Sequence, residues 1–279
     1  MQISEIEKIQ KGREYIRSKT DFIPDIAVVL GSGLAGLTRE VEVVHEISYG
    51  DVPYLKTSTT PFHDGKMIFG VLSGVKVLLM SGRVHLYEGY SVEDVVRPIR
   101  LVYELGAKKL ILTNASGAIN TDYHPGDLVV IKDHISSFVP SPIKGDIRRL
   151  IGTKLDFPDM CKVYDRELSN AVLDICHELE TVAHEGVYIQ VSGAQYETPA
   201  EINFYRIIGA DLVGMSTVVE ATCARHLGMR VVGVSMATNM AAGIEKVKLS
   251  HDDVKRVADR AQSKFIRVLK ESIVKISTI

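Results

Sequence analysis

Apolar residues recur along this chain in two periods, one typical of helices and one typical of strands. Helical spacing next to capping or stop signals predicts helices at 4–18, 91–106 and 166–180. Three further helices are predicted by one boundary each: one begins at 198, one ends near 228 and one begins at 250. Short apolar or alternating runs predict strands at 26–30, 41–47, 67–72, 75–80, 109–113, 128–131, 186–191, 212–214 and 230–235.

The order of these elements predicts the fold class. Strands and helices are intermixed throughout, which is typical of α/β proteins. The runs 67–72 and 75–80 flank Ser73-Gly74 as a hairpin, so the sheet is not purely parallel. We therefore predict an α/β fold with a mixed central β-sheet and helices on both faces. Because no repeat, low-complexity stretch or Pro/Gly/Ser-rich linker interrupts the chain, residues 1–279 are expected to form a single domain.

Composition narrows the classes of partner. The chain has 33 Lys and Arg against 35 Asp and Glu, a formal charge of -2, so no basic excess indicates a nucleic-acid or membrane surface. No apolar run approaches the roughly 18 residues of a membrane span, and the N-terminus lacks the apolar core of a secretory signal. Three scattered cysteines suit neither a disulfide framework nor a thiolate metal site. We expect a cytoplasmic protein without a metal that binds a small neutral or anionic ligand.

Residues 31–36 read Gly-Ser-Gly-Leu-Ala-Gly after a predicted strand and match a dinucleotide-binding pattern. That fold needs a full helix after the glycines, and too few residues separate Gly36 from the strand at Val41. A nucleophile elbow is excluded because Leu30 stands where glycine is required. A tight turn remains, whose N–H groups and Ser32 hydroxyl could hold an anion; a turn without a ligand stays the alternative.

A second candidate follows the strand at 75–80, where Arg83, His85 and Tyr87 alternate in period two. If strand geometry continues, the three side chains project to the same side. A guanidinium, an imidazole and a phenol together form a good oxyanion-binding set. A lone arginine or histidine at a strand end is usually only a solvated residue, but three on one side are harder to explain in that way.

Three further segments follow strands or precede a helix. The small residues at 113–117 would let a ligand approach the backbone. Tyr196 and Glu197 precede the Thr198 cap, where the positive helix end favours an ionised carboxylate. Asn239 lies in a predicted loop a few residues after a strand. Helix-end electrostatics for Glu197 and an ordinary loop amide for Asn239 are the alternatives.

Taken together, these segments resemble the trimeric purine nucleoside phosphorylase family, in one order from about Ile26 to His251. The matching segments are 30–34, 58–65, 82–89, 113–115, 133–134, 157–160, 196–198, 213–217, 224–226, 238–239 and 250–251. The resemblance implies phosphate-dependent, reversible cleavage of 6-oxopurine (deoxy)ribonucleosides to the free base and (deoxy)ribose 1-phosphate. It also implies a homotrimer with its active site near the subunit boundary and no cofactor, inorganic phosphate being a co-substrate.

The resemblance also implies roles for individual residues. Phosphate would be held by Ser32, His63, Arg83, His85, the Ala115 backbone and Ser216. The nucleoside would be bound by Tyr87, Tyr196, Glu197, Met215, Asn239 and His251, with Phe157 reaching in from a neighbouring subunit. Asn239, Glu197 and His85 would be the catalytic group. The Asn239 amide is expected to donate both to purine N7 and to a 6-oxo group, and Glu197 to accept from N1–H.

Some residues depart from the family pattern. Members usually have glycine at positions 35 and 118, a second alanine where Ser116 stands, and phenylalanine where Tyr196 stands; residues 136–155 also lack the usual pattern. A xanthosine-preferring phosphorylase therefore stays an alternative. A methylthioadenosine phosphorylase is disfavoured, since it normally has aspartate where Asn239 stands. A nucleoside sensor without turnover would not need Arg83 and His85.

Overall fold

The computed structural model describes residues 3–31, 33–59, 64–145, 157–245 and 251–279, with side chains from 256 onward in the last helix. Its strands are β1 (Ile26–Leu30), β2 (Glu42–Ser48), β3 (Lys66–Leu72), β4 (Val75–Ser81), β5 (Lys109–Ala118), β6 (Leu128–Ile135), β7 (Ala183–Gln190), β8 (Leu212–Gly214) and β9 (Arg230–Met240). Its α-helices are α1 (Glu5–Arg17), α2 (Val92–Glu104), α3 (Arg166–Glu178), α4 (Pro199–Ile207), α5 (Val218–His226) and α6 (His251–Ser277). Short 3₁₀ helices are η1 (Ala35–Glu40), η2 (Tyr49–Asp51) and η3 (Leu86–Glu88).

The strands form one nine-stranded sheet in the order β2-β3-β4-β1-β5-β8-β7-β6-β9. β1 is parallel to both β4 and β5, while β2-β3 and β3-β4 are antiparallel, as the predicted hairpin requires. The mixed sheet is thus confirmed. β5 also pairs with β9. The strand pairings therefore form a closed ring, which was not predicted and consists of β5, β8, β7, β6 and β9.

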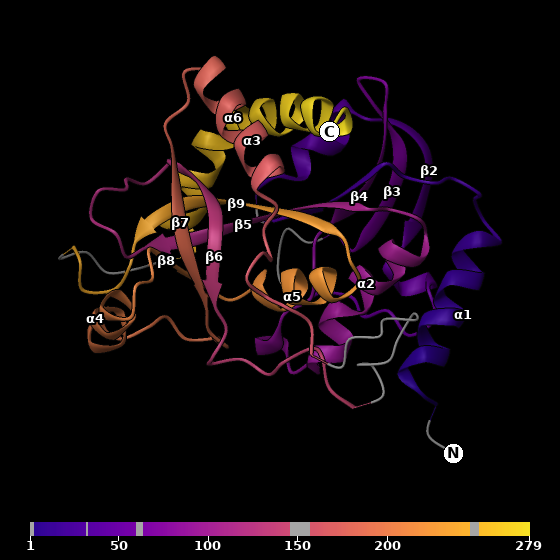
Figure 1. Cartoon of the computed structure of the whole chain (residues 1–279), viewed down its shortest axis with the longest axis horizontal. Helices are drawn as coiled ribbons and strands as arrows, with labels where there is room; N and C mark the ends of the chain where they lie inside the picture. Colours follow the sequence, from indigo (N-terminus) through magenta and orange to yellow (C-terminus); the bar gives the residue numbers. More distant parts are fainter. Residues whose placement is uncertain (1–2, 32, 60–63, 146–156, 246–250) are drawn as a thin grey trace.

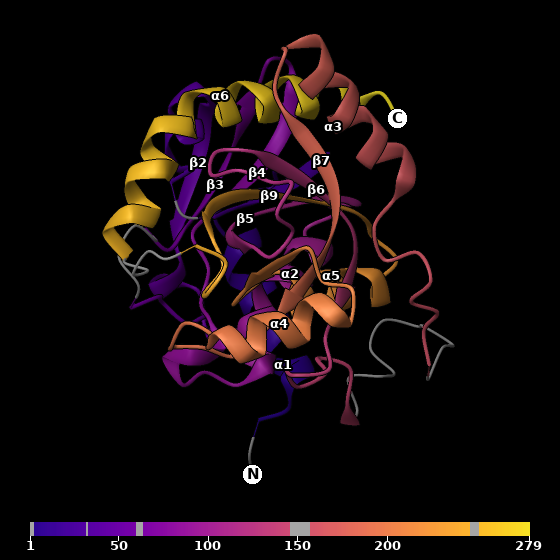
Figure 2. The ribbon, with the colours of Figure 1, turned by 90° about the vertical axis from the view of Figure 1, so that its left-hand side faces the viewer.

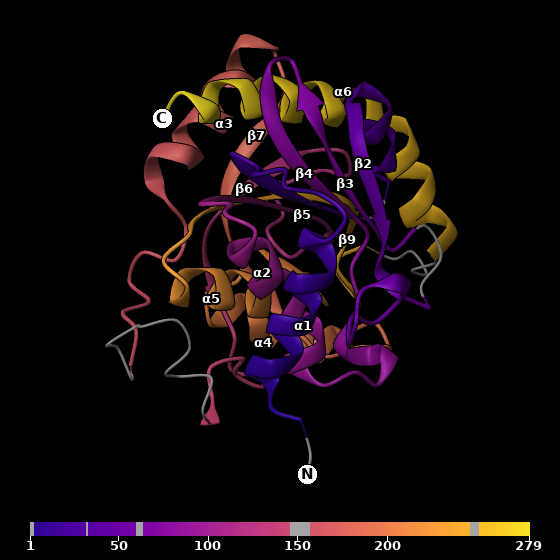
Figure 3. The ribbon, with the colours of Figure 1, turned by 90° about the vertical axis from the view of Figure 1, so that its right-hand side faces the viewer.

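Helices cover both faces of the sheet, which confirms the predicted α/β fold (Figures 1 and 2). α6 and α3 bury one apolar cluster, which includes Val28, Leu79 and Phe265. The other large cluster lies on the side of α1, α2 and α5 and includes Ala27 and Leu101. Figure 3 shows the same two helical layers from the opposite side. Among the described residues, no helix is long and apolar enough to cross a bilayer.

Two strands, β5 and β9, extend well beyond their predicted ends. β5 continues to Ala118 and β9 to Met240, so residues 114–117 and Asn239 lie within strands rather than in loops. Their small polar side chains lack the apolar pattern of a strand, but the two strands pair with each other through this stretch, with a register shift between Ser116 and Gly117. Backbone pairing satisfies the main chain here, so polarity on the side chains did not end the strands.

The structure agrees with the sequence signals around residues 31–36 and at the start of α4. After residues 31–36 the chain forms only the short η1, so no full helix follows the glycines, in agreement with the rejection of a dinucleotide site. α4 begins at the predicted Thr198 cap, with Pro199 at its first turn and Glu201 closing the capping box. α2 continues through Pro98 to Glu104.

Candidate active site

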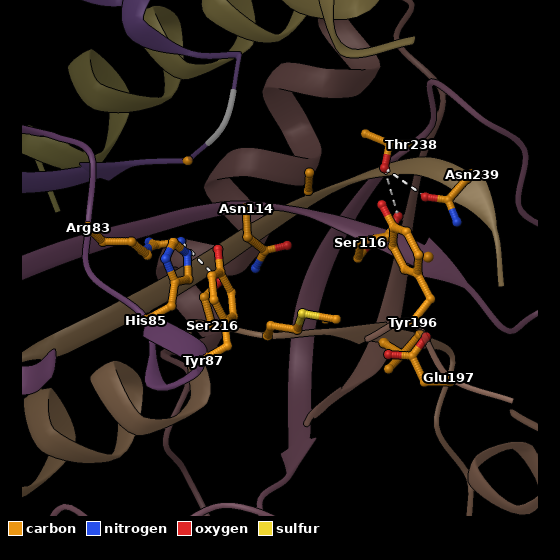
Figure 4. Close-up of a pocket in the computed structure, with 16 residues that line it drawn as sticks. Arg83, His85, Tyr87, Asn114, Ser116, Tyr196, Glu197, Ser216, Thr238 and Asn239 are labelled. Carbon is orange, nitrogen blue, oxygen red and sulfur yellow. Dashed lines mark hydrogen bonds between the residues drawn. The ribbon is translucent and has the colours of Figure 1, made fainter. Parts of the chain in front are cut away.

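An open pocket lies where β5, β8 and β9 meet the loops after β1, β4 and β7, and its empty volume is about 750 Å³ including the mouth (Figure 4). The lining residues are Gly31, Arg83, His85, Tyr87, Asn114, Ala115, Ser116, Gly117, Tyr196, Glu197, Val213, Gly214, Met215, Ser216, Thr238 and Asn239. Figure 4 shows two polar groups at opposite ends, Arg83 with His85 and Ser216 at one, and Glu197 with Asn239 at the other. We call these the anion end and the amide end.

Arg83 is the cation of the anion end and is only 5% exposed. Its Nε donates to Glu220 Oε1 at 3.1 Å, and its Nη1 donates to the Thr113 carbonyl at 2.7 Å and to Ser216 Oγ at 3.2 Å. Its Nη2 is buried and has no hydrogen-bond partner among the described residues. Because an unpaired buried donor is costly, this nitrogen is suited to an anion in the pocket.

Thr217 stands between the anion end and α5, and its φ of 85° is unusual for a β-branched residue. Two bonds hold it there: its N–H donates to Glu220 Oε2 at 3.1 Å, and its Oγ1 accepts from Asn114 Nδ2 at 2.8 Å. Burial raises the pKa of Glu220, and Arg83 and the Thr217 N–H oppose that rise. This strained turn fixes the position of the neighbouring Ser216.

His85 and Tyr87 lie side by side at the anion end, with their rings stacked at a centroid distance of 4.7 Å. Glu88 Oε1 accepts from the His85 N–H at 2.8 Å and lies 2.9 Å from His85 Nδ1. Burial lowers the pKa of His85 to about 4, although Glu88 opposes this. The imidazole is therefore neutral at pH 7 in the ligand-free pocket and, with its orientation fixed by Glu88, serves as a hydrogen-bonding group rather than a permanent charge.

The backbone at the start of the glycine segment approaches β5 closely. A Cβ on Gly31 would meet the Thr113 carbonyl oxygen at 2.7 Å and Asn114 Cα at 2.8 Å, so only glycine fits. The Gly31 N–H donates to Thr113 Oγ1 at 2.9 Å, and Gly33 has a positive φ of 82°. The predicted tight turn is present at the pocket wall; Ser32 itself lies outside the described residues.

Buried side chains form a hydrogen-bonded row beneath the middle of the pocket. Asn114 Oδ1 accepts from Ser235 Oγ at 2.5 Å, and Ser235 Oγ lies 2.7 Å from Ser116 Oγ. The Ser116 carbonyl in turn accepts from Thr238 Oγ1 at 3.2 Å. Because Asn114 also donates to Thr217, this row connects the two ends of the pocket through β5 and β9.

Asn239 projects from β9 at the amide end (Figure 4). Its Oδ1 accepts from Thr238 Oγ1 at 3.1 Å, and its Nδ2 donates to the Met240 carbonyl at 2.9 Å. A primary amide has two N–H donors, so one remains for a ligand. The expected double donation to N7 and a 6-oxo group is therefore not available in this geometry.

Glu197 and Tyr196 close the amide end from the loop before α4. Burial is the main cause that raises the pKa of Glu197, and the neighbouring Glu201 raises it further. The helix end was expected to favour ionisation, but desolvation has the larger effect here. Tyr196 is 41% exposed and lies at the mouth.

Comparison with known proteins identifies the family of this chain. Residues 25–274 match the family model described as the phosphorylase superfamily. The chain is 42% identical over 264 residues to purine nucleoside phosphorylase 1 of Bacillus subtilis, covering 95% of this chain and 97% of that protein. It is 37% identical over 281 residues to purine nucleoside phosphorylase of Rattus norvegicus, covering 96% of this chain and 95% of that protein.

The chain belongs to the purine nucleoside phosphorylase family.

A solved structure in this family has the same fold. The purine nucleoside phosphorylase of Schistosoma mansoni, crystallised in complex with adenosine, superposes with a TM-score of 0.90 at 34% identity, covering 98% of each chain. A crystal structure of schistosoma purine nucleoside phosphorylase in complex with hypoxanthine superposes with a TM-score of 0.86 at 35% identity. The resemblance stated from the sequence motifs is confirmed.

Most residues implied by the family resemblance meet in the one pocket. These are Arg83, His85, Tyr87, Ala115, Tyr196, Glu197, Met215, Ser216 and Asn239. Ser32 and His63 lie outside the described residues, and so does the side chain of His251, the first residue of α6. Phe157 does not line this pocket, and its side chain is 86% exposed.

The expectation that strand geometry continues through residues 83–87 was wrong, although the three side chains do line one pocket. Arg83, His85 and Tyr87 face one pocket, but not because a strand continues. β4 ends at Ser81, Gly82 has a φ of 97°, and Tyr87 sits in η3. The stacking of His85 on Tyr87, rather than strand alternation, brings these two side chains together.

Sequence reasoning missed the carboxylates of the anion end. Glu88 contacts His85 and Glu220 accepts from Arg83, and neither carboxylate was assigned a role from the sequence. A signal for Glu220 was present, since Thr217 and Glu220 have the spacing of a capping box. No group of His, Cys, Asp and Glu side chains in the described part of the chain could hold a metal ion.

Proposed function

We propose that this chain is a purine nucleoside phosphorylase that cleaves 6-oxopurine (deoxy)ribonucleosides reversibly, with phosphate, to the free base and (deoxy)ribose 1-phosphate. The observation that carries this proposal is the division of one pocket into an anion end and an amide end. Counting partners among the described residues only, a buried guanidinium with an unpaired Nη2 lies at one end, and an amide with one N–H left over lies at the other.

The reaction separates charge along this pocket. Breaking the C–N glycosidic bond leaves positive charge on the sugar and negative charge on the purine, so both must be stabilised together. Phosphate held by Arg83, Ser216 and His85 would supply an anion beside the sugar and then bond to C1′. The phosphate is then the nucleophile, and the protein needs to supply none.

The amide end would act on the leaving base. The remaining Asn239 N–H donates to N7 as negative charge grows there, and Glu197, in its ionised form, accepts from N1–H of a 6-oxopurine. Tyr87 and Met215 line the space between the two ends, where the sugar would lie.

The assembly and setting follow from the same proposal. We infer a cytoplasmic homotrimer without a cofactor or metal, in which inorganic phosphate is a co-substrate. In this proposal Phe157, whose side chain is 86% exposed, reaches a neighbouring subunit's pocket.

One assay tests the proposal. The protein is incubated with inosine, guanosine, xanthosine or adenosine, with phosphate, with arsenate or with neither, and free base is measured. We expect release from inosine and guanosine that requires phosphate or arsenate. Equal release without either anion would indicate a hydrolase, absence of release would indicate a nucleoside-binding sensor, and preference for xanthosine would change the assigned base.

A further inference from the structure

Glu220 is a buried carboxylate, 2% exposed, that does not line the pocket. It occupies the third position of α5, where it closes a capping box with Thr217. Unlike a surface cap, it also accepts from Arg83. A carboxylate so placed touches neither end of a bound nucleoside, yet contacts two groups of the anion end.

Its two oxygens are divided between those groups. Arginine–carboxylate pairs are frequently bidentate, with both carboxylate oxygens on the guanidinium. Here Oε1 takes the Arg83 Nε, while Oε2 accepts from the Thr217 N–H. The Arg83 Nη1 is held by Thr113 and Ser216. The guanidinium is thus fixed at two corners, and the third nitrogen, Nη2, is left without a partner among the described residues.

The second oxygen acts on the other anion-binding group. Thr217 has a φ of 85°, which a β-branched residue adopts only when its surroundings impose it. The bond from its N–H to Glu220 is part of that restraint, and Ser216 precedes it directly. Loss of this bond would let the turn relax and move the Ser216 hydroxyl.

We propose that Glu220 is a positioning residue for phosphate, which orients the Arg83 guanidinium with Nη2 uncommitted and holds the Ser216–Thr217 turn. This inference rests on the proposed function. Holding both groups before the ligand arrives lowers the ordering cost of binding, which for a long side chain such as arginine is substantial. Glu220 therefore sets the affinity for phosphate without touching it.

The alternative is that Glu220 only caps a helix, and the chain contains a matched control. Glu201 closes the capping box of α4 in the same way, accepting from the Thr198 N–H at 2.7 Å, but it does not line the pocket and pairs with no arginine in the described part of the chain. The change Glu201→Gln is chemically the same as Glu220→Gln, but it alters the cap of α4 and a charge near Glu197 at the amide end and leaves the anion end untouched.

The experiment compares these two variants in the full chain by steady-state kinetics with inosine and inorganic phosphate. We expect Glu220→Gln to raise the phosphate KM by about 10- to 100-fold, the equivalent of one hydrogen bond to a charged group, with a much smaller change in inosine KM at saturating phosphate. Glu201→Gln, which does not touch the anion end, should leave the phosphate KM within about twofold. Glu220→Asp, which keeps the charge but cannot reach both partners, should show the same split and serves if the glutamine variant does not fold.

An Arg83→Lys background tests whether Glu220 acts through the guanidinium. Lysine has no Nε donor, so Glu220→Gln should cost clearly less phosphate affinity there than in the parent protein. An unchanged phosphate KM in a folded Glu220 variant, equal rises in both KM values, or an equal effect in both backgrounds would overturn the inference. Base release by the parent protein without phosphate would instead refute the proposed function.

Discussion

The two ends of the pocket are built differently. At the anion end the groups are buried and tied to one another: Arg83 is 5% exposed and donates to three oxygens, and His85 is held by Glu88. At the amide end Tyr196 is 41% exposed and Glu197 comes from a loop. Under the proposed function, the anion would meet desolvated donors that are fixed in advance, an arrangement that strengthens recognition because water and mobile side chains weaken electrostatic interactions. A purine can be recognised by groups that stay partly open to solvent.

The largest expected effect is that of Arg83→Ala, which removes the cation of the anion end. We expect kcat/KM for phosphate, measured at saturating inosine, to fall by at least about 1,000-fold, since a buried charged contact is lost and its partner is left unpaired. The free energy of unfolding should also fall by about 3–5 kcal/mol, because Glu220 would stay buried without its cation.

Two measurements check this first prediction: phosphate titrations at saturating inosine and urea unfolding of the ligand-free protein. Arg83→Lys is the control, because it retains the charge but not the planar fork, and it should fall between the parent and the alanine variant. If a folded Arg83→Ala protein kept its phosphate dependence, Arg83 would have no role in the anion end.

At the amide end, Asn239→Asp should shift preference from 6-oxo towards 6-amino purines. A carboxylate cannot donate to N7, and a protonated one can donate to N7 and accept from a 6-amino group. Burial beside Glu197 would favour the protonated form. We expect inosine activity to fall by about 100- to 1,000-fold, with adenosine activity rising relative to it.

The ratio of kcat/KM for inosine and adenosine at saturating phosphate measures this shift. Asn203→Asp provides the matched control, because Asn203 is an exposed amide on α4 that accepts from Arg206 and does not line the pocket. An inosine-to-adenosine ratio equal to that of the parent would exclude Asn239 from base recognition.

Glu197→Gln should have a smaller effect, about tenfold on kcat/KM for inosine at neutral pH, since an amide oxygen still accepts from N1–H but without charge. The effect should depend on pH. The pKa of Glu197 is raised by burial, so its carboxylate is protonated at a higher pH than an ordinary glutamate. Inosine turnover should therefore decline as pH falls through that raised value, and it should recover as pH rises.

The pH profile of kcat/KM separates this role from simple packing. The glutamine variant lacks the titrating group, so the decline due to Glu197 should disappear from its profile. His85 has a pKa of about 4 and its own acidic limb should remain in both proteins. Superimposable profiles for parent and variant would contradict the assignment of Glu197 to N1–H.

The sequence pointed to some residues of this pocket and missed others, for a physical reason. Arg83 and His85 were singled out because their residue types suit an anion and follow a predicted strand, and Asn239 was assigned through the family resemblance; all three line the pocket. Glu220 was not singled out, because its role depends on a contact with Arg83, which is 137 positions away in the sequence. No local pattern encodes such a contact. The ring closure of β5 with β9 was likewise missed, because long-range pairing leaves no periodic signal in either strand.

The boundaries of β5 and β9 show the same limit. The polar residues Asn114, Ser116 and Ser235 bond one another, so a stretch that resembles a loop in sequence is a paired strand in the structure. Local polarity predicted the wrong boundaries although the strands themselves were correct. Their side chains also form the row that connects the anion end to the amide end, so substitutions in this row test whether it supports the anion end.

Ser116→Ala should test that row with the smallest effect. Ser116 lies 2.7 Å from Ser235 Oγ, but Ser235 keeps its bond to Asn114 when the Ser116 hydroxyl is removed. We expect a loss of about 1 kcal/mol in unfolding free energy and kcat/KM within about threefold of the parent. Ser235→Ala should cost more, because it frees the Asn114 amide that donates to Thr217 at the anion end. Both variants are compared by urea unfolding and by phosphate KM. A phosphate KM that rises more in Ser116→Ala than in Ser235→Ala would show that the row does not support the anion end through Asn114.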